Sequence, residues 1–181
     1  FQIEQSSLKS KITNKTKFII INSPNNPTGK VIKEEELQGI FNILRDNKNI
    51  SIISDEIYEL ILKKGNTHIS LAAFANDLQD RIYTVNGFAK GWAMTGWRLG
   101  YLVGKKEVIK ASSALQSQST SNVCSFVQRG ALAALNIKKE FFEEINKKYD
   151  ERREILFQGL RKMKGIYIAP PNGAFYAFPK L

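Results

Sequence analysis

The sequence predicts an α/β protein built on a mainly parallel sheet. Short apolar segments rich in β-branched residues recur through the first half of the chain, and stretches with helical spacing of apolar residues separate them. Strand, helix and strand in this order are typical of βαβ units, in which helices cover both faces of a parallel sheet. We therefore expect a three-layer αβα arrangement that binds its ligands at the carboxyl ends of the strands.

The first predicted strand covers residues 17–22 and enters the turn-rich segment 23–29. A helix should follow, because the three glutamates at 34–36 suit the first turn of a helix, where the macrodipole favours anions. Apolar residues then recur at helical spacing, at Leu37, Ile40, Phe41 and Leu44. The same reasoning predicts three more strands, at residues 50–54, 81–86 and 99–104.

The pattern becomes helical from residue 105 onward. A polar stretch at 116–122 precedes a long helical segment from about 125 to 164, which is interrupted near Asn136. Two short strands are predicted around the turn Pro170-Pro171-Asn172-Gly173, at residues 166–168 and 174–178. We place a domain change near Lys147, with residues 1–147 in a larger domain and residues 148–181 at the beginning of a smaller α+β domain.

Composition indicates an ordinary soluble globular protein. Hydrophobic residues make up 43% and charged residues 24% of the 181, with no apolar run long enough for a membrane span and no secretory-signal profile at the start. The single cysteine, Cys124, allows no internal disulfide and no metal cluster, so we expect no metal and a cytoplasmic location. The net charge is +10, but the lysines are spread along the chain, which argues against a nucleic-acid partner and favours anionic substrates.

Polar side chains follow three of the predicted strands. Asn26 lies after the first strand, Asp55 at the end of the second with Tyr58 three positions later, and Lys90 after the third. Because the carboxyl ends of parallel strands share one edge of a sheet, we expect these side chains to converge. Small neighbours leave the Lys90 amine open to close approach, and Arg98, eight positions later, favours the neutral, nucleophilic amine.

Three motifs in this order resemble those of the class I aminotransferases, the aspartate aminotransferase-like family that uses pyridoxal 5'-phosphate (PLP). They are an Asn-Pro-x-Gly loop, an Asp-Glu-x-Tyr segment and a lysine loop. The resemblance implies that Lys90 holds PLP as a Schiff base and moves the proton in transamination. It further implies that Asp55 binds the ring nitrogen of PLP, Asn26 and Tyr58 the ring oxygen, and Arg98 the phosphate.

Each of these five residues also has a purely structural interpretation. A lysine among small residues is usually a surface lysine, an aspartate after a strand is often a helix N-cap, and an asparagine before proline usually forms a turn. Arg98 could be a surface ion-pair partner, and Tyr58 a core aromatic residue with a solvated hydroxyl. Their joint order and spacing, rather than any one of them, favours the cofactor site. His68, the only histidine, lies in a polar segment, and we expect it to be solvated rather than part of a catalytic triad.

Gly87 departs from the family pattern, because many relatives carry a hydroxyl residue three positions before the lysine. The Asn-Gly-x-Ala-Lys version is similar to that of bacterial aspartate aminotransferases, including forms that accept prephenate. The resemblance therefore implies aspartate or glutamate as amino donor and a 2-oxo acid as acceptor. Alternatives are aromatic amino acids, alanine or prephenate, or a non-catalytic gene remnant.

The resemblance covers only the central part of a family member, truncated at both ends. No arginine follows Arg161 that could bind the α-carboxylate of a substrate, so we expect this fragment to be weakly active or inactive alone. By resemblance the full-length protein is a homodimer. The polar stretch at 116–122 is either a linker or a segment near the subunit interface and the mouth of the active site.

Overall fold

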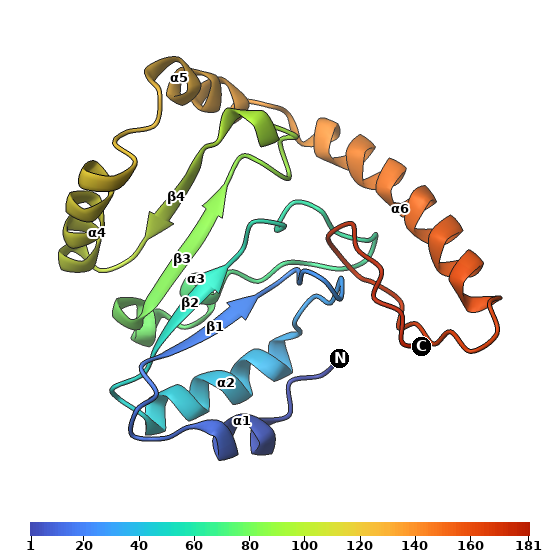
Figure 1. Ribbon diagram of the computed structural model, residues 1–181, viewed down its shortest axis with the longest axis horizontal. Helices are drawn as coiled ribbons and strands as arrows, with labels where there is room; N and C mark the ends of the chain where they lie inside the picture. Colours follow the sequence, from blue (N-terminus) through green and yellow to red (C-terminus); the bar gives the residue numbers. More distant parts are fainter.

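The computed structural model describes residues 1–181 and contains one four-stranded sheet, in the order β1-β2-β3-β4 (Figure 1). β1, β2 and β3 run parallel, with Asn22 opposite Asp55 and Asp55 opposite Val85 at their carboxyl ends. β4 runs antiparallel to β3, because the chain returns directly through the loop that contains Lys90 without a crossover helix. The α/β class and the mainly parallel sheet are confirmed. The strands are β1 (Phe18–Asn22), β2 (Ser51–Asp55), β3 (Ile82–Gly87) and β4 (Gly100–Val103).

Six helices accompany the sheet, together with two short 3-10 turns at Asn76–Arg81 and Thr95–Trp97. α2 begins at Glu34, as its acidic first turn predicts, and ends at Asp46. The polar stretch at 116–122 is helical as far as Ser119. None of these helices combines the length and the apolar character needed to cross a membrane. The helices are α1 (Gln5–Lys11), α2 (Glu34–Asp46), α3 (Leu71–Phe74), α4 (Lys106–Ser119), α5 (Ser125–Ala134) and α6 (Lys139–Arg161).

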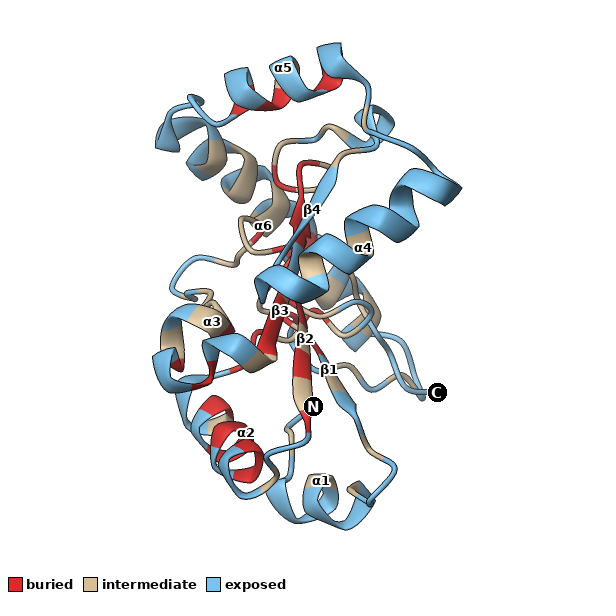
Figure 2. Cartoon of the chain, turned by 90° about the vertical axis from the view of Figure 1, so that its left-hand side faces the viewer, coloured by how far each residue is buried: buried red, intermediate tan, exposed pale blue.

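The main core lies between one face of the sheet and the helices α2 and α3 (Figure 2). Ile40 and Phe41 of α2 are fully buried against Ile52 of β2 and Ile82 of β3. Each such side chain stabilises the fold by about 1.5–3 kcal/mol through removal of apolar surface from water. The opposite face of the sheet is open within this chain, since Ile20 of β1 remains 72% exposed. The buried face fixes the register of the strands, and with it the positions of the residues at their ends.

The C-terminal segment does not form the predicted pair of strands. Tyr167 pairs with Lys180 and Gly173 with Leu62, each as an isolated bridge. The prediction fails because the amides of Gly173 and Ala174 donate to Gly29 and Ile61, which belong to distant parts of the chain. Ala174 also has a left-handed backbone, with φ of 51°, which interrupts an extended conformation. The segment therefore packs against the loops that follow β1 and β2 instead of against residues 166–168.

Candidate active site

The carboxyl ends of β1 and β2 bring Asn26 and Asp55 into one region through a residue that the sequence motifs did not single out. Asn22, the last residue of β1, donates from Nδ2 to the carbonyl oxygen of Asp55 at 3.2 Å. Its Oδ1 accepts the backbone N–H of Asn26 at 2.7 Å. Asn22 thus ties the loop that carries Asn26 to the strand end that carries Asp55. Its position as the final residue of a buried strand is the signal that could have identified it.

Tyr58 lies at the centre of this region. The residue is only 4% exposed, and its hydroxyl lies 2.5 Å from the hydroxyl of Tyr176. Burial, the Tyr176 hydroxyl and the charge of Asp55 raise the pKa of the Tyr58 phenol above its usual value, while the neighbouring Asn26 side chain acts in the opposite direction. Tyr58 therefore keeps its proton throughout the physiological pH range and can act as a hydrogen-bond donor.

Lys90 approaches Tyr58 from the loop between β3 and β4. Its Nζ lies 5.8 Å from the centroid of the Tyr58 ring and 5.8 Å from that of Phe175. No carboxylate pairs with this amine, as the small residues around it in the sequence predict. Nζ of Lys90 thus faces aromatic rings rather than a carboxylate, which leaves the amine open to close approach by a cofactor.

Backbone contacts explain why position 87 carries glycine. A Cβ atom at Gly87 would lie 2.7 Å from the carbonyl oxygen of Leu99 and 2.8 Å from the Cα of Gly100. The end of β3 therefore approaches β4 too closely for any side chain. Asn86, which is buried beside it, donates to Glu59 at 2.7 Å and accepts from the Gly87 amide at 2.7 Å. These bonds hold the start of the lysine loop in place.

Arg98 lies at the other end of the lysine loop and is exposed. Its guanidinium donates to the carbonyl oxygen of Thr95 at 3.0 Å and makes no hydrogen bond to the other four predicted site residues. Its backbone is left-handed, with φ of 53°. The structure thus brings Asn26, Asp55 and Lys90 close to Tyr58 and shows no hydrogen bond between Arg98 and these four residues. The cofactor-binding roles of all five residues stay predictions.

The donor set of this region fits PLP. A carboxylate at a strand end suits a protonated ring nitrogen, because an anion there favours the charged ring. A phenol that keeps its proton and a nearby amide suit a ring oxygen that carries negative charge. An unpaired amine suits the aldehyde of the cofactor. Asp55, Tyr58, Asn26 and Lys90 supply these groups in turn.

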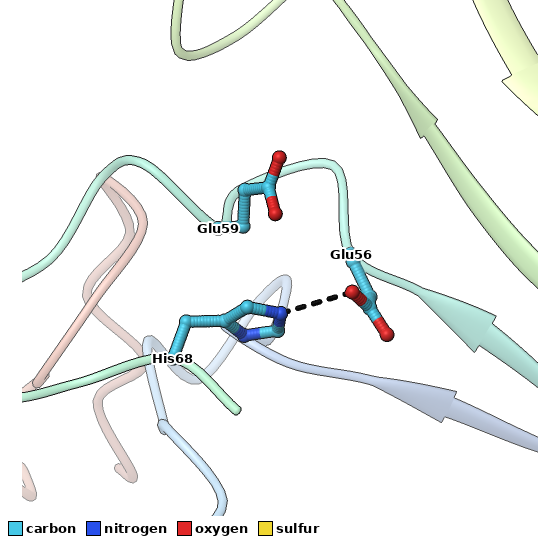
Figure 3. Close-up of side chains that lie close together, drawn as sticks. All are labelled: Glu56, Glu59 and His68. Atoms are coloured by element: carbon cyan, nitrogen blue, oxygen red, sulfur yellow. Dashed lines mark hydrogen bonds and ion pairs between the residues drawn. The ribbon is translucent and has the colours of Figure 1, made fainter. Parts of the chain in front are cut away.

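A buried carboxylate, Glu56, braces the segment that carries Asp55 and Tyr58 (Figure 3). The residue is 2% exposed, and its Oε1 accepts from the hydroxyls of Ser54 and Ser70 at 2.8 and 3.2 Å and from the Leu71 amide at 3.2 Å. Its Oε2 lies 3.0 Å from Nε2 of His68. The prediction of a solvated His68 is wrong, since its side chain is only 9% exposed. Sequence neighbours alone did not reveal the partner, which lies twelve residues away.

The pKa of the Glu56 carboxyl group depends on the hydrogen bonds that it accepts. Burial alone would raise the pKa of Glu56, but the bonds from His68 and Ser54 outweigh it and lower the pKa below its usual value. Glu56, Glu59 and His68 each offer one atom that could bind a metal ion, all within 4.8 Å of one another. Glu56 and Glu59 already accept hydrogen bonds from Ser54, Ser70, Leu71 and Asn86. We therefore interpret the cluster as structural, and the absence of a metal stays a prediction.

All 181 residues match the family model described as Aminotransferase class I and II. The chain belongs to the class I and II aminotransferase family. It is 42% identical over 180 residues to a probable aspartate/prephenate aminotransferase of Rickettsia felis, covering 99% of this chain and 44% of the relative. It is also 42% identical over 179 residues to an aspartate aminotransferase of Bacillus subtilis, covering 99% of this chain and 45% of that protein.

Solved structures of aminotransferases share the fold of this member of the family. The aspartate aminotransferase of Rhizobium meliloti superposes with a TM-score of 0.95 at 34% identity, covering 98% of this chain and 44% of that structure. The aromatic aminotransferase of Pyrococcus horikoshii gives a TM-score of 0.94 at 36% identity, covering 100% of this chain and 48% of that structure. The aminotransferase chain described here thus spans less than half the length of the relatives it matches.

Proposed function

We propose that these residues form the PLP-binding core of an aminotransferase that moves the amino group of aspartate or glutamate to a 2-oxo acid. The observation that carries the proposal is the unpaired Lys90 amine, 5.8 Å from the ring of a Tyr58 that Asn26 and Asp55 flank. Membership of the class I and II family supports it. Because the chain spans less than half of its relatives, the activity belongs to a protein that supplies the remaining parts of the site.

Each predicted site residue would have its own role in this transamination. PLP, when bound, supplies an electron sink that makes the α-proton of an amino acid removable. Lys90 would hold the cofactor through Nζ. Once the amino group of the substrate has displaced Nζ, the freed amine would accept the proton from the α-carbon of the substrate and deliver it to the cofactor side. The Asp55 carboxylate would keep a ring nitrogen protonated, Tyr58 and Asn26 would donate to a ring oxygen, and Arg98 would pair with a phosphate.

The proposed substrate class follows the printed names of the relatives and the charge of the chain. Relatives from Rickettsia felis and Bacillus subtilis are named for aspartate, and the former also for prephenate. A net charge of +10 attracts dicarboxylates, which carry more negative charge than other amino acids. Aromatic amino acids are the second candidate, favoured by the similarity to the aromatic aminotransferase of Pyrococcus horikoshii.

We propose the larger organisation by the same reasoning. Residues 1–147 would be part of the large PLP-binding domain and residues 148–181 the beginning of the small domain. The boundary lies inside α6, which runs without a break from Lys139 to Arg161. A continuous helix would then connect the two domains. The full-length protein would act as a homodimer.

The decisive test is spectroscopic. PLP added to the protein expressed from the open reading frame that contains these residues should give a near-visible absorption band, and borohydride should fix the cofactor to Lys90, as peptide mass spectrometry would show. Lys90→Ala should abolish both signals, whereas Lys15→Ala, at an exposed lysine in a turn, should change neither. Turnover with aspartate and 2-oxoglutarate should disappear with the same variant. Labelling of another lysine in the wild type would refute the proposal.

A further inference from the structure

Two tyrosine hydroxyls meet within the candidate site, although their residues are 118 positions apart. The Tyr58 and Tyr176 oxygens lie 2.5 Å from each other, a short distance for a hydrogen bond between hydroxyl groups. The two rings pack edge to face, with centroids 5.6 Å apart and an interplanar angle of 83°. Tyr176 does not belong to any of the three motifs that identify the cofactor site. Its hydroxyl nevertheless contacts the side chain at the centre of that site.

Main-chain hydrogen bonds hold the segment that carries Tyr176. The amides of Asn172 and Gly173 both donate to the carbonyl oxygen of Gly29, at 2.7 and 2.8 Å, and the Ala174 amide donates to Ile61 at 2.8 Å. Gly29 ends the loop that contains Asn26, and Ile61 follows Tyr58 by three residues. The segment therefore fastens together the two loops that would bind the ring oxygen of PLP.

A buried arginine fixes the same segment from the other side. Arg153 of α6 donates to the carbonyl oxygen of Ala174 at 2.8 Å and also pairs with Asp150. Phe175 stacks on Tyr149 of α6, with ring centroids 5.8 Å apart. Tyr176 is thus held in place by contacts that do not involve Tyr58. A rigidly held hydroxyl can orient its partner, whereas a mobile one cannot.

We propose that Tyr176 is a positioning residue of the cofactor site, whose hydroxyl donates to the Tyr58 oxygen and thereby directs the Tyr58 hydrogen toward the ring oxygen of PLP. The inference rests on the proposed function, because it takes PLP as the group that Tyr58 binds. Of two hydroxyls in one hydrogen bond, only one donates to the other. If Tyr58 donates to the cofactor, Tyr176 must be the donor within the pair.

The donation has a measurable electrostatic effect. A hydroxyl that accepts a hydrogen bond becomes a stronger donor, by about 10–30% of the bond energy. Tyr58 would therefore stabilise negative charge on the ring oxygen better with Tyr176 present than without it. The other charged groups that face Tyr58 are Asp55 on its own segment and Lys90 from the lysine loop. Neither group is altered when the Tyr176 hydroxyl is removed.

The test follows the absorption spectrum of bound PLP as a function of pH, in the protein expressed from the open reading frame that contains these residues. The pH midpoint of the spectrum would report loss of the proton from the nitrogen that joins Lys90 to PLP. That proton offsets the negative charge on the ring oxygen. If the remaining hydrogen bonds to the ring oxygen are weaker, the proton is lost less readily and the midpoint moves to higher pH. Tyr176→Phe should raise the midpoint by roughly 0.3 pH units. Tyr58→Phe should raise it by roughly 1 unit, because the direct bond is lost.

The double variant decides whether Tyr176 acts through Tyr58. In a Tyr58→Phe background, Tyr176→Phe should cause no further shift, since the intermediary is missing. Tyr167→Phe is the matched control, because this tyrosine belongs to the same C-terminal region but is 72% exposed, and it should leave the midpoint unchanged. The inference would be overturned if Tyr176→Phe left the midpoint unchanged or lowered it, or if it shifted the midpoint equally in the wild-type and Tyr58→Phe backgrounds. Either result would leave the proposed function intact. A wild type without the PLP band would overturn the proposed function, and this inference with it.

Discussion

Removal of the Glu56 carboxylate should destabilise the protein more than any single surface change. Four groups donate to this buried side chain, namely the hydroxyls of Ser54 and Ser70, the Leu71 amide and the His68 ring. A buried hydrogen bond contributes about 1 kcal/mol, and more when the acceptor is charged. Glu56→Ala leaves all four donors without an acceptor, so we expect the free energy of unfolding to fall by about 4 kcal/mol.

Glu56→Gln separates the role of the charge from that of the shape. The amide keeps one oxygen for the donors on the Oε1 side but turns an N–H₂ group toward His68, so we expect a loss of about 1.5 kcal/mol. Urea unfolding followed by circular dichroism measures both losses. Glu151→Ala, at an exposed position of α6, is the matched control and should change the free energy by less than about 0.5 kcal/mol. If Glu56→Ala resembled this control, the interpretation of Glu56 as a brace would be wrong.

Three further outcomes follow from burial and charge. Because the folded-state pKa of Glu56 is lowered, its contribution to stability is present above the unfolded pKa of about 4.3 and is lost as the pH falls through the lower folded value. The difference in urea stability between wild type and Glu56→Gln should therefore shrink below that pH. Phe41→Ala removes a fully buried ring and should cost about 4 kcal/mol, measured by calorimetry. Arg153→Met leaves the Ala174 carbonyl oxygen without its donor, and limited proteolysis should cut residues 171–176 faster than in wild type.

Sequence patterns predicted the strands of the sheet because each strand is specified by residues that are neighbours in the sequence. Each strand is a short apolar run bounded by turn or polar residues, and β1, expected at 17–22, is observed at Phe18–Asn22. The acidic first turn of α2 marked the start of the helix for the same reason. The carboxyl ends of parallel strands lie at one edge of the sheet, and this rule predicted that Asn26 and Asp55 lie in one region, as the hydrogen bonds of Asn22 show.

Contacts between distant segments were not predictable in this way. Gly173 and Ala174 look like part of a strand, but their hydrogen-bond partners are Gly29 and Ile61, which no local pattern connects with them. Glu56 is an instructive intermediate case. Strand alternation continues from Ile52 and Ser54 to Glu56 and places this carboxylate on the buried face, where charged side chains are rare.

The hydroxyl pair described above also sets an order of events during synthesis of the protein. Its two members are 118 residues apart, and ribosomes add about 5–20 residues per second. Roughly 6 to 24 s therefore pass between the emergence of the first phenol and that of the second. During this interval β3 and β4 are synthesised and can pair with the earlier strands, but residues 172–176, which link the loops after β1 and β2, are not yet present. Vitamin B6 capture would then wait for the docking of residues 172–176 onto a preformed scaffold.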